Sequence, residues 1–286
     1  MDTVQFDDVD LTYWLQDGGG ERVVLVHASA FVSWYEPLVD RLPDHATLRY
    51  RRRLRPTGDG TIRPLTVAED AATCRRLLDH VGWPAAHVAG HSYGALVAME
   101  LATSAPEHVR SLALLEPAAR GISSSEAIAA ALAPVIAAYR SGDTAGAVDG
   151  FLRHVCGPGY RATLDRVLPH AFGEALAEAD LFFRGEMPAV QSWSFGADDA
   201  ARVTQPVLDV LGAESEPRFA AGSELLASWF PQAERLSVPG AGHLLMVQNP
   251  EALARGLARF VDRHPLADGD RSRPAAGSGR GGGGRW

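Results

Sequence analysis

The sequence predicts an α/β fold with a mostly parallel sheet, and two patterns support that prediction. Short apolar runs, such as Val-Val-Leu-Val at residues 23–26 and Leu-Ala-Leu-Leu at residues 112–115, are typical of strands buried on both faces. Stretches of helical periodicity separate these runs, and regular alternation of strands and helices forms parallel sheets. The 286 residues suffice for one large domain of this class or for two small ones.

The elements expected in the first half follow from the period of its apolar residues. An alternating stretch at residues 9–15 runs into Gly18-Gly19-Gly20, which predicts a strand and a tight turn. Thr66-Val67-Ala68-Glu69 has the spacing of a capping box and predicts the start of a helix. We also expect strands at residues 23–26, 47–51, 86–89 and 111–115, and helices at residues 34–42 and 93–104.

The alternation stops near residue 120 and resumes near residue 203. The stretch between is rich in Ala with helical periodicity, and Ser123-Ser124-Ser125-Glu126 is a good helix start. Strands are expected again at residues 207–211 and 236–238, before a last helix with Asn249 as its cap and Pro250 at its first position. The chain therefore divides into a core (1–119 and 203–265), a helical insertion (120–202) and a tail (266–286) whose Gly, Arg and Ser content predicts disorder.

The composition excludes several classes of function. All 27 basic residues are Arg, so a phosphate-loop Lys, a Schiff-base Lys and a Ser-Lys dyad are excluded. The net charge of −8 disfavours nucleic acids and anionic membranes as partners. Neither Cys74 nor Cys156 belongs to a metal-ligand pattern, and we expect no metal or other cofactor. An acidic N-terminus and the lack of long apolar runs predict a cytoplasmic protein, with a small-molecule substrate as partner and a homodimer as one option.

A Gly-x-Ser-x-Gly pentapeptide, Gly90-His91-Ser92-Tyr93-Gly94, joins a predicted buried strand to a predicted helix. Small residues on both sides of Ser92 permit a sharp turn that lifts its hydroxyl above the sheet, as a nucleophile requires. At the N-terminus of the helix, the amide of Tyr93 can stabilise an oxyanion. The alternative is a Gly-rich connection in which Ser92 only caps the helix.

A serine nucleophile needs a general base, and His243 is the best candidate among ten histidines. It follows the strand at residues 236–238 in the small-residue loop Gly240-Ala241-Gly242, which would bring an imidazole over the edge of the sheet. Two carboxylates could orient this imidazole, Glu116 after the strand at residues 111–115 and Glu214 after the strand at residues 207–211. We favour Glu116 and keep Glu214 as the alternative acid; either could instead be a helix cap or a solvated loop charge.

These segments resemble the α/β-hydrolase superfamily over residues 3–265. The resemblance rests on the elbow at residues 90–94, on Val26-His27-Ala28-Ser29, on Leu115-Glu116-Pro117 and on Gly240-Ala241-Gly242-His243. It implies an α/β-hydrolase fold, with a mostly parallel eight-stranded sheet flanked by helices and residues 120–202 as a helical lid after the sixth strand. It also implies that the amide of Ser29 is the second oxyanion donor beside that of Tyr93.

Three segments depart from the superfamily pattern. The frequent His-Gly is His27-Ala28 in this chain. In the superfamily, the acid most often lies three residues after the Gly that ends the seventh strand, and this chain has Ser215 there. Some relatives, such as haloalkane dehalogenases, carry the acid after the sixth strand instead, where this chain has Glu116. The Arg-rich segment at residues 51–60 replaces a Gly-rich motif, and we expect its arginines to lie in a solvated loop or, alternatively, to bind an anionic group of the substrate.

The activity implied is that of a serine hydrolase that cleaves a carboxylic ester, lactone or thioester through an acyl-enzyme on Ser92. The substrate is expected to be hydrophobic and bound by His27, Phe182 and Trp193, although the aromatic residues could equally form the core of a helical unit. Two alternatives stay open. One is an enzyme of the same fold with non-hydrolytic, C–C bond, perhydrolase or cyclisation chemistry, and the other is a non-catalytic binder of small molecules.

Overall fold

The computed structural model describes residues 1–6, 9–54, 63–118, 125–267 and 270. These residues form one eight-stranded sheet with the order β1-β2-β4-β3-β5-β6-β7-β8. The pairs β1/β2 and β2/β4 are antiparallel, and all later pairs are parallel. This arrangement confirms the predicted α/β fold. The strands are β1 (Asp2–Gln5), β2 (Val9–Gln16), β3 (Arg22–Val26), β4 (Ala46–Leu54), β5 (Ala86–His91), β6 (Val109–Leu115), β7 (Val207–Gly212) and β8 (Glu234–Val238).

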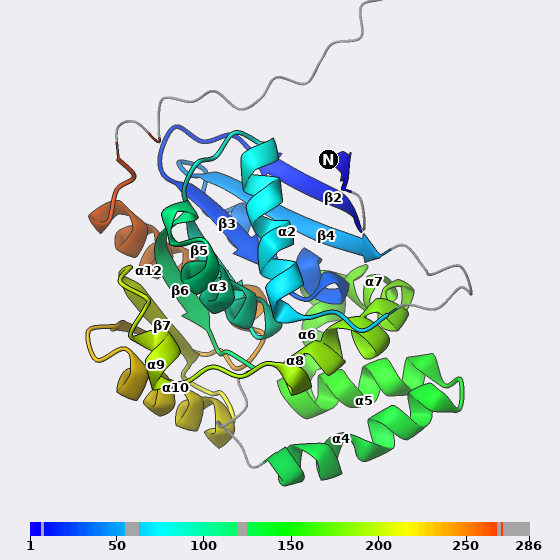
Figure 1. Cartoon of the computed structure of the whole chain (residues 1–286). Coiled ribbons are helices and arrows are strands. Elements are labelled where there is room, and N and C mark those ends of the chain that lie inside the picture. Colours follow the sequence, from blue (N-terminus) through cyan, green and yellow to red (C-terminus); the bar gives the residue numbers. More distant parts are fainter. Residues whose placement is uncertain (7–8, 55–62, 119–124, 268–269, 271–286) are drawn as a thin grey trace, which may run out of the picture.

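Helices cover the sheet, with α2 and α3 in front of it and α12 behind it in Figure 1. Those outside the long helical stretch are η1 (Ser29–Tyr35), α1 (Glu36–Val39), α2 (Val67–His80), α3 (Tyr93–Ser104), η2 (Pro106–His108), α10 (Pro217–Trp229), α11 (Leu245–Gln248) and α12 (Pro250–Arg263). Among the described helices, none combines the length and the hydropathy that a membrane span requires.

A run of helices without strands separates β6 from β7, and we call it the helical segment (residues 125–200). It comprises α4 (Ser125–Arg140), α5 (Thr144–Cys156), α6 (Tyr160–Val167), α7 (Ala171–Ala177), the π-helix η3 (Leu181–Glu186), α8 (Met187–Ser192) and α9 (Ala197–Ala200). Its helices from α4 to α8 lie beyond the ends of the strands at the lower right of Figure 1, whereas α9 lies near α10 below β7. The helical segment therefore sits at the carboxyl edge of the sheet, where parallel α/β folds carry their sites.

Two local predictions are confirmed in detail because each depends on neighbouring residues alone. At the start of α2, the Glu69 amide donates to Thr66 Oγ1 over 3.1 Å and the Thr66 amide donates to Glu69 Oε2 over 2.9 Å, which is the expected capping box. At the start of α12, the Ala252 amide donates to Asn249 Oδ1 over 3.0 Å.

Three predictions were wrong where tertiary packing decides the local structure. The helix expected at residues 34–42 begins earlier as η1, in which every side chain is buried, and continues only as the short α1. The strand expected to end at Arg51 continues to residue 54, so Arg52 lies in β4, fully buried, and not in a solvated loop; residues 55–60 lie outside the described part of the chain. Leu266, expected to be the first residue of the disordered tail, is buried and its amide donates to the Glu21 carboxylate over 2.6 Å, whereas residues 268–269 and 271–286 lie outside the described part of the chain. Ser123 and Ser124, part of the expected helix start, also fall outside the described residues.

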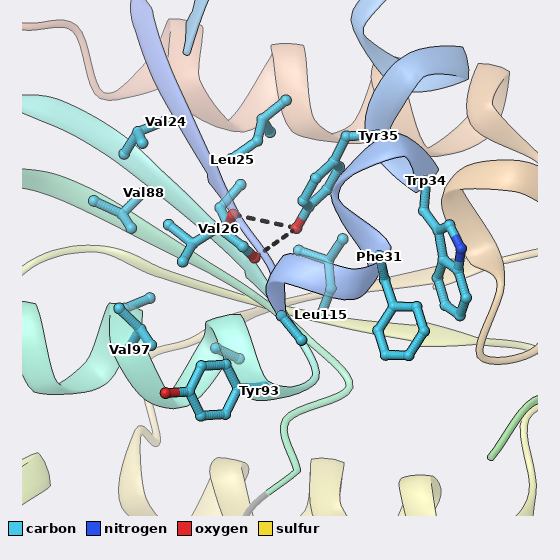
Figure 2. Close-up of a cluster of buried hydrophobic side chains, with 14 of the residues drawn as sticks. Val24, Leu25, Val26, Phe31, Trp34, Tyr35, Val88, Tyr93, Val97 and Leu115 are labelled. Carbon is cyan, nitrogen blue, oxygen red and sulfur yellow. Dashed lines mark hydrogen bonds between the residues drawn. The ribbon is translucent and has the colours of Figure 1, made fainter. Parts of the chain in front are cut away.

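Tyr35, on η1, joins two central strands at the edge that carries the candidate site. Its hydroxyl donates to the carbonyl oxygens of Val26 at 3.1 Å and Ala89 at 3.3 Å, near the ends of β3 and β5 (Figure 2). Burial raises the pKa of this phenol well above its usual range, so it remains a donor. Phe31 and Trp34 lie beside it on the same 3-10 helix (Figure 2). The loop after β3 is thus fixed relative to β5.

Candidate active site

Ser92 lies in a sharp turn between β5 and α3, with φ 52° and ψ −114°. A left-handed φ of this kind is strained for any residue other than Gly. The flanking glycines are required by space, because a Cβ at Gly90 would lie 2.3 Å from the Gly94 oxygen and a Cβ at Gly94 would lie 1.9 Å from the Val26 oxygen. The Ser92 amide donates to the Leu115 oxygen over 2.9 Å, which ties the turn to the end of β6.

His243 and Glu116 meet directly although 127 positions separate them in the sequence. His243 Nδ1 lies 2.7 Å from Glu116 Oε2, and both side chains are buried. Because the carboxylate accepts the hydrogen on Nδ1, the other ring nitrogen, Nε2, is left as the acceptor of the neutral imidazole. Glu214, the alternative acid, is exposed. Its backbone amide donates to the Ala241 oxygen over 2.9 Å.

Glu116 is held by groups at the end of the next strand, β7, and in the turn that follows it. Its Oε1 accepts hydrogen bonds from the Gly212 amide at 2.8 Å and from the Ser215 hydroxyl. Glu116 itself has a left-handed φ of 45°, directly after β6. Ser215 therefore supports the carboxylate from the position where relatives often carry the acid, a role that the sequence analysis missed. The sequence carries a signal for this role, because Ser215 lies three residues after the Gly that ends β7.

His91, the residue that precedes Ser92, contacts two further histidines, His27 and His243, and we call these three with Glu116 the imidazole group. The Ala28 amide donates to His27 Nδ1 over 2.8 Å, so His27 Nε2 carries the hydrogen and donates to His91 Nδ1 over 2.8 Å. The ring of His91 lies 4.4 Å from that of His243. Burial, followed by the neighbouring His243, lowers the pKa of both His27 and His91. Both are therefore neutral at neutral pH.

His27, which is expected to bind substrate, is buried at the end of β3, and its role toward a substrate stays a prediction. Both of its ring nitrogens have partners inside the protein, and its ring makes edge contacts with Phe31, Trp34 and Tyr35. Phe219, which the sequence analysis missed, stacks on the ring of His243 with centroids 4.3 Å apart. No periodic signal distinguishes Phe219 from other apolar residues of α10.

A second buried polar cluster, which we call the arginine group, comprises Arg52, Asp70, Tyr93 and Glu186. Arg52 Nε lies 3.2 Å from Asp70 Oδ1, its Nη2 pairs with Glu186 Oε1, and the Tyr93 hydroxyl donates to Asp70 Oδ2. Burial raises the pKa of Asp70 to about 6, against the opposing effect of Arg52. Burial by itself would lower the pKa of Arg52, but Asp70 and then Glu186 raise it well above its usual value. The group thus holds one cation between two carboxyl groups.

Ser29, expected to supply the second oxyanion donor, does not have a free amide in this structure. Its N–H donates to Glu186 Oε1 over 2.9 Å, and both residues are fully buried. The amide of Tyr93 lies in the first turn of α3, as expected. Sequence alone gave no sign that a carboxylate from position 186 would reach the loop after β3.

The two aromatic residues expected to bind substrate lie in different places. Phe182 packs against Phe31 and Phe151, with ring centroids 5.2 and 4.6 Å apart, and Phe31 touches the ring of His27. Trp193 instead donates its indole hydrogen to Glu100 on α3 over 2.9 Å. Glu100 is eight residues beyond Ser92, about 12 Å along the helix axis, so this hydrogen bond itself lies away from Ser92, and the role of Trp193 toward a substrate stays a prediction. The described residues include no group of three His, Cys, Asp or Glu side chains that could hold a metal ion.

The model of the alpha/beta hydrolase family matches residues 23–256, which span the sheet, the elbow and His243. The chain belongs to the alpha/beta hydrolase family. It is therefore an enzyme of a fold family in which solved relatives include hydrolases. A hydrolase from Pseudomonas aeruginosa PA01 is 25% identical with a TM-score of 0.73, and the match covers 91% of this chain and 97% of that one. A thermophilic esterase from Thermogutta terrifontis is 18% identical with a TM-score of 0.76, covering 93% and 100%, and shows the shared fold.

Among curated proteins, the chain is similar to the acetyltransferase component (dihydrolipoyllysine-residue) of an acetoin cleaving system from Cupriavidus necator. The two are 36% identical over 132 residues, which is 41% of this chain and 33% of that protein. The chain therefore covers only about a third of the length of this relative. A second protein with the same name, from Pseudomonas putida, is 27% identical over 89% of this chain and 67% of its own length.

Proposed function

We propose that this enzyme is a serine hydrolase that cleaves the carboxylic ester, lactone or thioester of a hydrophobic small molecule. The observation that supports this proposal most is the 2.7 Å contact between His243 Nδ1 and Glu116 Oε2 at the sheet edge where Ser92 occupies its strained turn. A carboxylate in this place fixes the tautomer of the base and stabilises the imidazolium that forms when the base takes a proton.

In this proposal, Ser92 Oγ attacks the acyl carbon while His243 Nε2 takes the hydroxyl proton. The bond to the leaving alcohol or thiol then breaks, and the leaving group takes that proton from His243. Water next attacks the acyl-enzyme and gives its proton to His243; the bond to Ser92 breaks, and Ser92 regains the proton as the acid product departs. The amide of Tyr93 would stabilise the negative charge of each tetrahedral intermediate, with the amide of Ser29 as the second donor once it is free.

A hydrophobic substrate is favoured by the aromatic cluster of Phe31, Phe151 and Phe182, which brings residues of η1, α5 and η3 together near His27. In this proposal the helical segment acts as a lid, with the acyl or alcohol portion of the substrate lying against this cluster. Neither partner macromolecules nor a cofactor are needed for the reaction.

The experiment that tests this proposal is labelling with a fluorophosphonate, followed by intact-mass and peptide mapping of the native chain and of Ser92→Ala. An activated Ser92 would form an Oγ–P bond with loss of fluoride, while His243 takes the proton. We expect stoichiometric labelling of Ser92 in the native chain and none in the variant. A folded native chain that is not labelled, or a label on another residue, would overturn the proposal.

A second candidate function is acyl transfer from the same acyl-enzyme to an acceptor other than water. The similarity to two proteins named as acetyltransferase components favours this candidate. Product analysis distinguishes the two functions, because hydrolysis yields the free acid whereas transfer yields a new ester or thioester when an alcohol or thiol is added. Free acid as the sole product, at every acceptor concentration, would exclude transfer.

A further inference from the structure

Glu186 is a fully buried carboxylate on the helical segment, and it reaches the loop after β3. One of its oxygens, Oε1, accepts the Ser29 amide hydrogen over 2.9 Å and also pairs with Arg52 Nη2. The other oxygen, Oε2, is buried without a hydrogen-bond partner. The carboxylate is thus placed by Ser29 and Arg52 and is only half satisfied.

An oxyanion hole works only if its N–H groups point at the position of the substrate oxygen. A single N–H has one hydrogen, and a carboxylate is a stronger acceptor than the carbonyl of an ester. We infer that Glu186 competes with the substrate for the amide of Ser29, so that the structure is a closed form and acyl transfer requires Glu186 to withdraw. This inference rests on the proposed function, because only acyl chemistry at Ser92 needs that amide.

The surroundings of Glu186 allow it to withdraw without leaving Arg52 unpaired. Arg52 keeps the contact of 3.2 Å with Asp70 and a hydrogen bond of 3.3 Å to the His27 oxygen. The neighbouring residue in η3, Gly185, is linked to the core by one longer hydrogen bond, 3.3 Å from the Leu65 amide to its oxygen. Withdrawal of the Glu186 side chain therefore breaks its pairs with Ser29 and Arg52 but does not require the aromatic contacts of Phe182 in η3 to break.

The helical segment has a second ion pair with β4 that serves as a control. Glu174 Oε2 on α7 lies 3.0 Å from Arg51 Nη2, one position along β4 from Arg52. Glu174→Gln weakens this link between the helical segment and the sheet but leaves the Ser29 amide with its partner. A comparison of the two positions therefore separates release of the amide from general loosening of the helical segment.

The test measures the second-order rate of fluorophosphonate labelling at Ser92, since the phosphoryl oxygen of the probe must take the place of Glu186 Oε1. We expect Glu186→Gln to be labelled faster than the native chain. Glu186→Ala should be labelled faster still, about tenfold faster than the native chain, as when a charge-assisted hydrogen bond is removed. Glu174→Gln should stay within about twofold of the native rate, because its effect is that of a partly exposed ion pair. Equal or slower labelling of folded Glu186 variants would overturn the inference.

A second measurement uses only the native chain, in case the variants do not fold. Hydrogen–deuterium exchange of peptides covering residues 181–192 should increase when Ser92 carries the phosphonyl group, because Glu186 then no longer accepts the hydrogen bond from the Ser29 amide. Unchanged exchange in the labelled protein would overturn the inference. If the native chain and every variant fail to label, the proposed serine chemistry itself fails, whereas labelling of all chains at one rate removes only the role of Glu186.

Discussion

The residues on either side of Ser92 belong to two buried polar groups that deal with charge in different ways. His91 belongs to the imidazole group, in which burial lowers the pKa of two histidines and keeps them neutral. Tyr93 belongs to the arginine group, in which a cation stays charged because two carboxyl groups surround it. Ionised groups are costly to bury, so a protein must neutralise them or pair them, and this molecule does both within one site.

The difference suggests a division of work. Neutral rings beside His243 do not repel the positive charge that forms on it during proposed catalysis, so the imidazole group suits the base. The arginine group instead connects β4, α2, α3 and η3 through charged contacts, so it suits the positioning of the elbow and of the helical segment. Variants that alter one group and leave the other intact test this division.

The largest effect is expected for Glu116, the acid of the imidazole group. Glu116→Gln should reduce kcat by about 10³- to 10⁴-fold, because the amide cannot stabilise the imidazolium and favours the wrong tautomer. Glu214→Gln should stay within about twofold of the native chain, because Glu214 is exposed. Steady-state kinetics on one activated ester check both. Equal losses in the two variants would refute Glu116 as the single acid.

The next largest effect is expected for the stability of the arginine group. Arg52→Met should lower the free energy of unfolding by about 3–5 kcal/mol, because it leaves Asp70 and Glu186 buried without a cation. Arg75→Met, which breaks the exposed pair with Asp79 on α2, should cost less than about 1 kcal/mol. Urea unfolding with equal m-values measures both. A loss for Arg52→Met no larger than for Arg75→Met would show that the group contributes no specific stability.

The two groups should respond to pH with opposite signs. Burial lowers the pKa of His91 in the folded chain well below its usual value of 6.5. Below pH 6.5, His91 therefore binds a proton in the unfolded chain but not in the folded one, and the free energy of unfolding decreases as the pH falls. Burial raises the pKa of Asp70 from 3.8 to about 6, so between these values the folded chain binds the extra proton and stability is lost as the pH rises.

Two variants test this contrast through the slope of unfolding free energy against pH between 4 and 6.5. His91→Gln should reduce the acid loss by up to about 1.4 kcal/mol per pH unit, which corresponds to one proton. Asp70→Asn should make the acid loss steeper, because the opposing contribution is gone. Slopes that change in the same direction would contradict the assignment of opposite signs.

The smallest effect is expected at Trp193, which separates a structural contact from a substrate contact. Trp193→Phe removes the hydrogen bond to Glu100 and should cost about 1–2 kcal/mol of stability without changing KM. Phe182→Leu, near the candidate site, should instead raise KM several-fold for a hydrophobic ester. A KM change confined to Trp193→Phe would instead make Trp193 the substrate contact.

Local signals in the sequence were sufficient for much of the fold. The capping box at Thr66 and Glu69, the cap at Asn249 and the elbow at residues 90–94 depend on residues close together in the chain, and the structure has each where it was expected. The two glycines of the elbow are dictated by space, so the position of the sharp turn was readable from the letters alone.

Contacts between distant residues were decided by the tertiary structure. Glu116 and Glu214 looked alike in sequence, and only the packing of β6 beside β7 brings the first to His243 and leaves the second exposed. The row of arginines at residues 51–53 looked like a solvated loop, but partners on α2 and η3 bury Arg52 within β4. The reason is physical: the sequence determines backbone preferences over a few residues, whereas burial of a charge depends on partners that folding brings from other elements, as it brings Asp70 from α2 and Glu186 from η3.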